Sequence, residues 1–118
     1  MSCLALLSLR TIYIGSILIW FFITASGIKA EPIISEFLAN NQSSLKDEDS
    51  ESSDWIEIHN PENIEADLTG YSLSDDPENP QKWIFPAGTR LPANGRIIVF
   101  SSGKDRLAPN QLHTNFSI

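Results

Sequence analysis

The chain has 118 residues, with eight Lys and Arg against 15 Asp and Glu, and a formal net charge of −7. This length allows one domain and a short appendage, and the first 30 residues, which contain no acidic residue, have the composition of the appendage. Because they carry Arg10 and Lys29 but no carboxylate, the remaining 88 residues have a net charge of −9. A field this negative repels nucleic-acid phosphates and anionic lipid, so the charge excludes nucleic-acid binding and a basic membrane-surface contact.

Residues 1–30 are predicted to form a helical, hydrophobic secretory signal peptide. Arg10 precedes an apolar run from Ile12 to Ile23, and small residues then lead to Ala30, the expected cleavage site. The residue two positions before Ala30 is bulkier than the usual alanine, so an uncleaved single-pass membrane anchor over residues 11–28 is the alternative. A span needs about 20 apolar residues, and the run is short for that. We therefore expect an exported protein that touches a membrane only through an uncleaved leader.

Cysteine chemistry is excluded for the exported part of the chain, residues 31–118. Cys3 is the only cysteine and lies in the leader, so the exported part has neither a disulfide framework nor a thiolate. A domain of this size without disulfides depends on its apolar core, and it buries only roughly 60 to 65% of the unfolded surface.

The first two strands of this domain are predicted at Ile33–Leu38 and Trp55–Asn60. The first is a β-branched apolar run that ends in an Asn-rich cluster. The second alternates with a period of two and stops at Pro61, which lacks a backbone donor. We expect Trp55–Asn60 to be a central strand. The polar loop from Asn40 to Ser53 separates the two and carries a run of acidic residues.

Further short strands are predicted between turns rich in glycine and proline. They are Ile64–Leu68, Tyr71–Leu73, Lys82–Phe85, Thr89–Leu91, Arg96–Phe100 and a last one that starts at Leu112 and runs to Ile118. Gly70 is expected to take a positive φ in a bend between the first two of these. Pro92–Gly95 predicts a hairpin turn between Leu91 and Ile97. Arg96–Phe100 is the most apolar run and is expected to be buried on both faces.

Short strands with frequent turns, and no helical periodicity beyond the leader, predict an all-β sandwich. Trp55, Trp83, Phe85 and Phe100 are expected to be core aromatics, with Trp83 and Phe85 on one face. The last strand pattern continues to the final residue, so we expect the sequence to be a fragment of a longer product.

Five blocks of sequence occur in a fixed order: S-E-F-L-A-N-N (35–41), D-W-I-E-I-H-N-P (54–61), D-L-T-G-Y-S-L-S-D-D-P (67–77), K-W-I-F-P-A-G-T-R-L-P-A-N-G-R-I-I-V-F-S-S-G-K-D-R (82–106) and L-H-T-N-F-S-I (112–118). Together they resemble the bacterial type of lamin tail domain. The resemblance implies an immunoglobulin-like β-sandwich that is incomplete at its C-terminus, since the strands expected after Phe116 are absent. It also implies an exported protein in which this domain often adjoins a kinase, nuclease or phosphatase module, none of which is in the sequence.

The acidic loop is the one candidate site. Asp47, Asp49 and Glu51 alternate, with Asp54 beyond them, and such carboxylates can supply the about six to eight oxygen ligands that Ca²⁺ takes. The EF-hand spacing is only partly met, because Ser52 stands at the glycine position. A solvated acidic loop without a metal is the alternative.

Two other groups of polar residues have simpler interpretations. Asp75, Asp76 and Glu78 are expected to cap a proline-rich turn, with a second oxygen cluster as the alternative. His59 and His113 are expected to be half-buried packing residues. No local spacing brings the two histidines together with carboxylates, which argues against a zinc site.

No nucleophile elbow and no phosphate-binding glycine loop occur in the sequence, so we expect no enzymatic activity. The predicted function is that of an exported binding or structural module for adhesion, targeting or scaffolding, with an unidentified protein or cell-surface partner. An exposed edge strand is a physical route to such binding. Two alternatives remain: an accessory domain of a larger secreted kinase or hydrolase, and a calcium-stabilised structural module.

Overall fold

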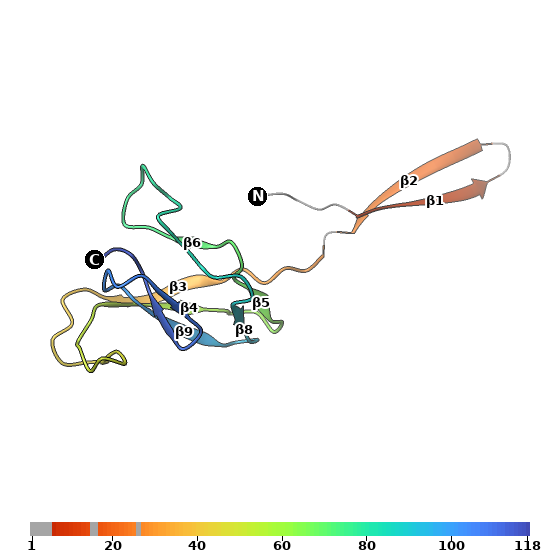
Figure 1. Cartoon of the computed structure of the whole chain (residues 1–118). Coiled ribbons are helices and arrows are strands. Elements are labelled where there is room, and N and C mark those ends of the chain that lie inside the picture. The colour runs from red at the N-terminus through yellow and green to blue at the C-terminus, as the bar shows by residue number, and fades with distance from the viewer. Residues whose placement is uncertain (1–5, 15–16, 26) are drawn as a thin grey trace.

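The computed structural model describes residues 6–14, 17–25 and 27–118 (Figure 1). Within these ranges the regular elements are strands, with no helix, which confirms the all-β prediction. After the leader they are β3 (Ile33–Leu38), β4 (Trp55–His59), β5 (Ala66–Asp67), β6 (Ser72–Leu73), β7 (Trp83–Ile84), β8 (Arg90–Leu91), β9 (Arg96–Phe100), β10 (Arg106–Ala108) and β11 (Gln111–His113).

The main layer is a five-stranded sheet with the order β10-β11-β9-β4-β3. β4 pairs antiparallel with both neighbours, so that Ile56 lies opposite Phe37 of β3 and Val99 of β9. This confirms the predicted central strand. β11 joins β9 in parallel through His113 and Phe100. β3 therefore forms one edge of the sheet, and β10 forms the other.

The second layer consists of two short antiparallel pairs, β5 with β8 and β6 with β7. A hydrophobic cluster joins it to the main sheet and contains Ile56, Ile58, Ala66, Leu68, Leu73, Trp83, Phe85, Leu91 and Val99, among others. Trp83 and Phe85 are both buried and meet edge to face at 4.9 Å, whereas Ile84 between them is half exposed. This confirms the prediction that the two aromatic side chains point to the same face. Burial of each side chain of this size stabilises the fold by about 1.5 to 3 kcal/mol.

The predicted hairpin around Pro92–Gly95 is wrong, although its turn forms. Gly95 N donates to Pro92 O at 2.9 Å, and Asn94 has a φ of 57°. The strands on either side separate, because β8 pairs with β5 and β9 pairs with β4. Gly70 has the expected positive φ of 79°. The strands on either side of it, β5 and β6, do not pair with each other, because β5 pairs with β8 and β6 pairs with β7.

Two expectations for the C-terminal half are also wrong. In β9 only Val99 is fully buried, because the second layer covers one face of the sheet, and Arg96 is exposed. β10 lies in the segment that the sequence predicts as a loop, where its pairing with β11 outweighs a weak local pattern. β11 ends at His113, so the predicted strand to Ile118 is shorter than expected.

The leader forms an antiparallel pair of strands, β1 (Leu6–Ile14) and β2 (Ile17–Ala25), which extends away from the sandwich (Figure 1). The predicted signal helix over residues 1–30 stays a prediction. Among the described residues, no helix has the length and apolarity to cross a membrane. Residues 1–5, 15–16 and 26 of the predicted leader lie outside the described ones, and the signal peptide stays a prediction.

Candidate functional site

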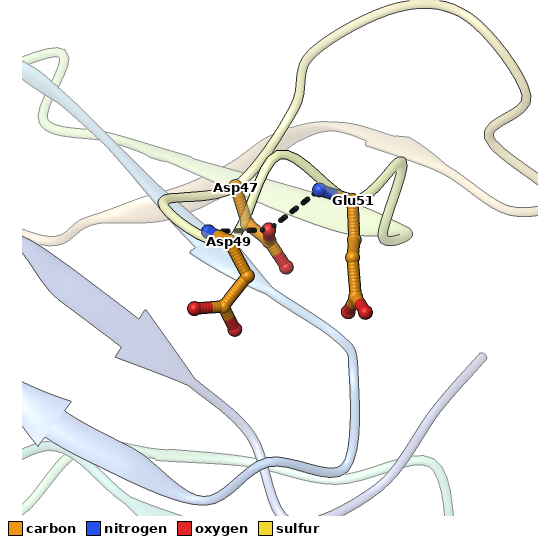
Figure 2. Close-up of side chains that lie close together, drawn as sticks. All are labelled: Asp47, Asp49 and Glu51. Carbon is orange, nitrogen blue, oxygen red and sulfur yellow. Dashed lines mark hydrogen bonds between the residues drawn. The ribbon is translucent and has the colours of Figure 1, made fainter.

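The loop between β3 and β4 is built around the carboxylate of Asp47, which is 6% exposed. Oδ1 accepts hydrogen bonds from the backbone N–H of Asp49 and Glu51, both at 3.0 Å, as Figure 2 shows. Oδ2 accepts a hydrogen bond from Ser53 Oγ at 2.8 Å. The backbone of Ser50, with a φ of 65°, donates to Asp47 O at 2.9 Å. The backbone N–H groups of this loop have no partner in a strand. Because the Asp47 carboxylate accepts their hydrogen bonds instead, the polar segment folds into a defined turn.

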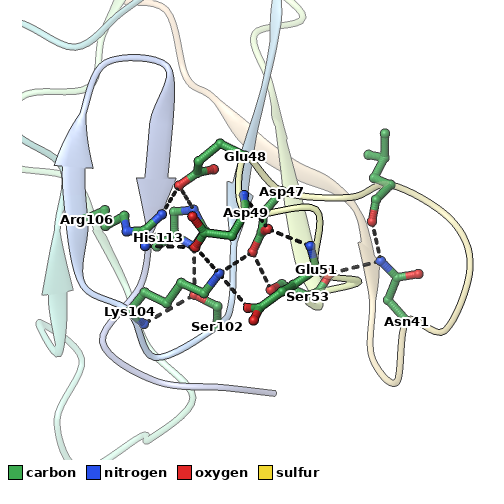
Figure 3. A network of polar contacts seen from close by, with 11 residues as sticks. Asn41, Asp47, Glu48, Asp49, Glu51, Ser53, Ser102, Lys104, Arg106 and His113 are labelled. Atoms are coloured by element: carbon green, nitrogen blue, oxygen red, sulfur yellow. Dashed lines mark hydrogen bonds and ion pairs between the residues drawn. The ribbon is translucent and has the colours of Figure 1, made fainter.

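The ammonium of Lys104, which follows β9, lies among three carboxylates of this loop (Figure 3). Its Nζ is 2.6 Å from Asp47 Oδ2, 2.7 Å from Asp49 Oδ2 and 2.7 Å from Glu51 Oε2. One oxygen of each carboxylate lies within 4.8 Å of the others, a spacing that suits a cation. The structure thus brings together three of the four predicted calcium ligands and places a cation of the chain itself between them.

These contacts shift the pKa values of both partners. Burial alone would raise the pKa of Asp47, but hydrogen bonds from Lys104, Ser53 and two backbone amides outweigh it and hold that pKa far below its usual value. Burial would likewise lower the pKa of Lys104, but the carboxylates of Asp47, Asp49 and Glu51 raise it well above the ordinary value. Both groups therefore stay charged throughout the physiological range.

Arg106 and Glu48 extend the ionic network. Arg106 Nη2 lies 2.8 Å from Asp49 Oδ2, and Nη1 pairs with Glu48 Oε1. Hydrogen bonds from Arg106 and Lys104 lower the pKa of Asp49, and hydrogen bonds to Asp49 and Glu48 raise that of Arg106. Lys104 and Arg106 thus offset two of the four negative charges of Asp47, Glu48, Asp49 and Glu51.

His113 of β11 is fully buried and uses both ring nitrogens, which corrects the expected half-buried packing role. Nε2 lies 2.7 Å from Glu48 Oε1, and Nδ1 lies 2.7 Å from Ser102 Oγ. The ring is tilted by 30° against Phe100, with centroids 5.2 Å apart. Burial alone would raise the pKa of Glu48, but hydrogen bonds that include those from His113 and Arg106 lower it. His113 therefore fastens the acidic loop to the end of the sheet.

Ser102, His113 and Glu48 are hydrogen-bonded in series. Hydrolases that use a serine nucleophile have the same sequence of groups. Here the His113 ring is 0% exposed, so no substrate carbonyl can reach the contact between the ring and Ser102. Ser102 Oγ also accepts the backbone N–H of Lys104 at 3.2 Å, and Glu48 is shared with Arg106. The constellation holds segments of the fold together and is not suited to acyl transfer.

Asp54, the fourth predicted calcium ligand, lies apart from the other three. Its Oδ1 accepts the backbone N–H of Asn41 at 2.7 Å, and the Asn41 side chain closes the loop by donating to two backbone carbonyls. The loop covers Trp55, whose Nε1 lies 3.3 Å from Ser44 Oγ. Trp55 is buried as predicted, but it lies outside the core cluster between the layers.

The second acidic group behaves as the turn that the sequence predicts. Asp76 Oδ1 accepts the backbone N–H of Glu78 at 2.9 Å, and Asp75 pairs with Lys82 at 2.8 Å. Asp76 therefore has a partner within its own turn, and Asp75 has one in the residue before β7.

The sequence interpretation missed four residues of the network: Glu48, Lys104, Arg106 and His113. Two of them left a signal, because Lys104 and Arg106 repeat with the same spacing of two as Asp47 and Asp49. Opposite charges attract at short range, so alternating cations are a candidate partner for alternating carboxylates. The contact of His113 depends on the parallel pairing of β11 with β9, which has no local signature.

A second candidate site is the apolar edge of β3. Ile34 and Phe37 are 57% and 64% exposed although they lie opposite Ile58 and Ile56 of the core face. A groove of about 220 Å³ runs along them and is lined by Ile34, Phe37, Ile56 and Ile118. Because its exposed apolar side chains are grouped in this way, the edge is a candidate binding surface.

Comparison with known families agrees with the layered all-β architecture. The family model of the Lamin Tail Domain matches residues 26–117. No curated protein and no solved structure matches the chain at a significant level. The chain therefore belongs to the lamin tail domain family, whose members are immunoglobulin-like binding and structural domains without catalytic activity.

Proposed function

We propose that the protein is an exported, non-catalytic binding module that works at the cell surface through the β3 edge. The observation that carries this proposal is the exposure of Phe37 and Ile34 beside the apolar groove. A small domain loses stability when it leaves such side chains in water, so we expect this surface to be covered, and the proposal assigns that role to a partner.

The export half of the proposal rests on the leader. Arg10, the apolar run and the small residues before Ala30 have the order of a secretory signal. The absence of cysteine from residues 31–118 lets the domain fold in an oxidising compartment without disulfide exchange.

Fractionation of cells that express the full chain tests export. The expected product outside the cytoplasm has lost the leader, and N-terminal sequencing identifies it. A product that stays in the cytoplasm with an intact leader contradicts the export half.

Retention at the cell envelope tests binding. Phe37→Asp is expected to release the protein on washing, because it places a charge in the groove. Leu107→Asp is the matched control, since Leu107 is 50% exposed on β10 at the opposite edge of the same sheet. Equal retention of both variants and the parent protein contradicts a binding role for β3.

A calcium-stabilised structural module is the second candidate, favoured by the close carboxylates of Asp47, Asp49 and Glu51. Lys104 lies between them, so Ca²⁺ has to displace the ammonium before it can bind. We expect millimolar Ca²⁺ to raise the melting temperature of Lys104→Met more than that of the parent protein. Adding Asp49→Asn to Lys104→Met should remove the effect. An unchanged melt in all three proteins contradicts this candidate.

A further inference from the structure

We propose that the leader is cut at the peptide bond between Gly27 and Ile28, so that residues 28–30 stay with the exported domain. This inference rests on the proposed export and names the bond that is broken, three residues before the cut that the leader pattern predicts. Three features carry it: the burial of Ala30, the contacts of Lys29 and the exposed bond between two suitable residues.

Ala30 belongs to the core of the folded domain. It is 5% exposed and is part of the same hydrophobic cluster as Ile56, Leu68 and Trp83. A cut after Ala30 would remove this side chain with the leader and expose its neighbours in the cluster to water. A domain of this size has few buried apolar groups to lose. The cut therefore lies before Ala30.

Lys29 also contacts the domain. Its Nζ lies 5.4 Å from the centroid of the Tyr71 ring, a cation–π contact, and Tyr71 packs against the core cluster. Hydrogen bonds from Thr69 lower the pKa of Asp67, and the charges of Arg90 and Lys29 lower it further. The match to the lamin tail domain, residues 26–117, likewise includes the segment before Ala30. Residues 29 and 30 are thus part of the domain.

The bond between Gly27 and Ile28 has the features of a processing site. Ala25 and Gly27 supply the two small residues, at alternate positions, that precede a secretory cut. A cut after Ala30 would instead place the bulky Ile28 in the first of these positions. Gly27 is exposed and Ile28 is 88% exposed, so a peptidase reaches the bond. A membrane-bound peptidase of the exporting cell adds water across the bond, which leaves a carboxylate on Gly27 and an amino group on Ile28.

N-terminal sequencing and the intact mass of the exported protein test the inference. The full chain is expressed in an exporting bacterial host, and the product outside the cytoplasm should begin Ile-Lys-Ala-Glu-Pro. A product that begins Glu-Pro-Ile-Ile-Ser, or at any other residue, overturns the inference but leaves export in place. A full-length chain held in the membrane overturns it too. A full-length chain in the cytoplasm contradicts the proposed export and the inference with it.

Leucine substitutions identify the small residues that the peptidase needs. Gly27→Leu and Ala25→Leu should each leave the chain at full length, because each places a bulky side chain in one of the two small positions. Both residues lie before the cut, so neither variant alters the exported domain. Ala30→Leu is the matched control and should be processed like the parent chain. Pulse labelling measures processing whether or not the product folds. Normal processing of Gly27→Leu, or a block by Ala30→Leu, overturns the inference.

The melting temperature of the exported product tests whether Ala30 is part of it. Ala30→Asp should lower this temperature by at least about 5 °C, because it places an unpaired charge in the core. Ala30→Gly removes only the buried methyl group, should cause a smaller loss and serves if Ala30→Asp does not fold. Ala87→Asp makes the same chemical change as Ala30→Asp at an exposed turn and should leave the melt nearly unchanged. Ala30 variants that melt like the parent product overturn the inference.

Discussion

Lys104 Nζ lies 2.6 Å from Asp47 Oδ2, although 57 residues separate the two in the chain. The contact fixes the loop between β3 and β4 against the segment that follows β9. Asp47 organises its own loop through backbone hydrogen bonds, so a cation held by this one carboxylate orients the whole turn. The acidic run thereby becomes part of the fold.

Replacing Lys104 with methionine should destabilise the protein by about 2 kcal/mol, because Asp47 is left buried without its cation. Chemical denaturation of both proteins measures the difference. Lys82→Met is the matched control, since Lys82 pairs with Asp75 at the surface and should cost less than about 1 kcal/mol. If both variants lose the same unfolding free energy, the buried contact of Lys104 stabilises the protein no more than the surface contact of Lys82.

Stability should fall at acid pH. The pKa values of Asp47, Glu48 and Asp49 are lowered in the folded protein from their ordinary 3.8, 4.5 and 3.8. Such groups bind fewer protons when folded, so their stabilisation is complete above the ordinary values and is lost as the pH falls below them. Thermal melts from neutral to acid pH should therefore be flat above about pH 5 and then fall. Asp47→Asn should fall less steeply, and parallel curves would contradict the assignment.

The raised pKa of Lys104 predicts a loss of stability at alkaline pH, as the pH rises, in contrast to the loss at acid pH from the carboxylates. Its stabilisation is complete below the ordinary value of 10.5 and is lost only as the pH rises through the folded value. Melts of the parent protein and Lys104→Met should therefore differ by a constant amount between about pH 5 and about pH 10. A difference that already disappears near neutral pH would contradict the strong ion pairing.

His113→Phe should cost about 2 kcal/mol in unfolding free energy, although it keeps a ring of similar size against Phe100. The variant removes a hydrogen-bond partner of Glu48 and of Ser102 in a buried site, where an unsatisfied polar group lowers the unfolding free energy most. His59→Phe, at a half-buried position of β4, is the control and should change stability by less than about 0.5 kcal/mol. Urea titrations of the two variants measure both effects.

Asn60→Ala should be among the most destabilising polar substitutions, at about 3 kcal/mol. Its fully buried amide donates to Ile64 O at 2.7 Å and Pro92 O at 3.0 Å, and Oδ1 accepts the backbone N–H of Glu62 at 3.1 Å. Removing the amide leaves these backbone groups without partners. Asn63→Ala, three residues away and exposed, should be close to neutral. The thermal midpoints of the two variants should therefore differ clearly.

The fold was predictable where the local pattern decides the structure. Period-two alternation places β4, and the β-branched run places β3 with its exact observed bounds. Pairing was less predictable, because it depends on contacts between distant segments. The turn at Pro92–Gly95 looks like a hairpin turn, yet the Asn60 side chain binds the carbonyl of Pro92 and β8 pairs with β5.

The candidate sites were predictable only in part. The alternation of Asp47, Asp49 and Glu51 indicated a shared cation, and the structure brings these carboxylates together. The cation between them, Lys104, comes from a segment whose approach depends on the sheet order. The apolar edge of β3 was equally hidden, since Ile34 and Phe37 have the pattern of core residues and their exposure depends on what the second layer covers.

A double-mutant cycle between Asp47 and Lys104 tests the central claim, that this contact fastens the acidic loop to the sheet. The unfolding free energies of the parent protein, Asp47→Asn, Lys104→Met and the double variant supply the four corners. We expect a coupling of at least about 1 kcal/mol, so that the second substitution costs much less once the first is present. A coupling near zero, with the two losses simply additive, would contradict the claim.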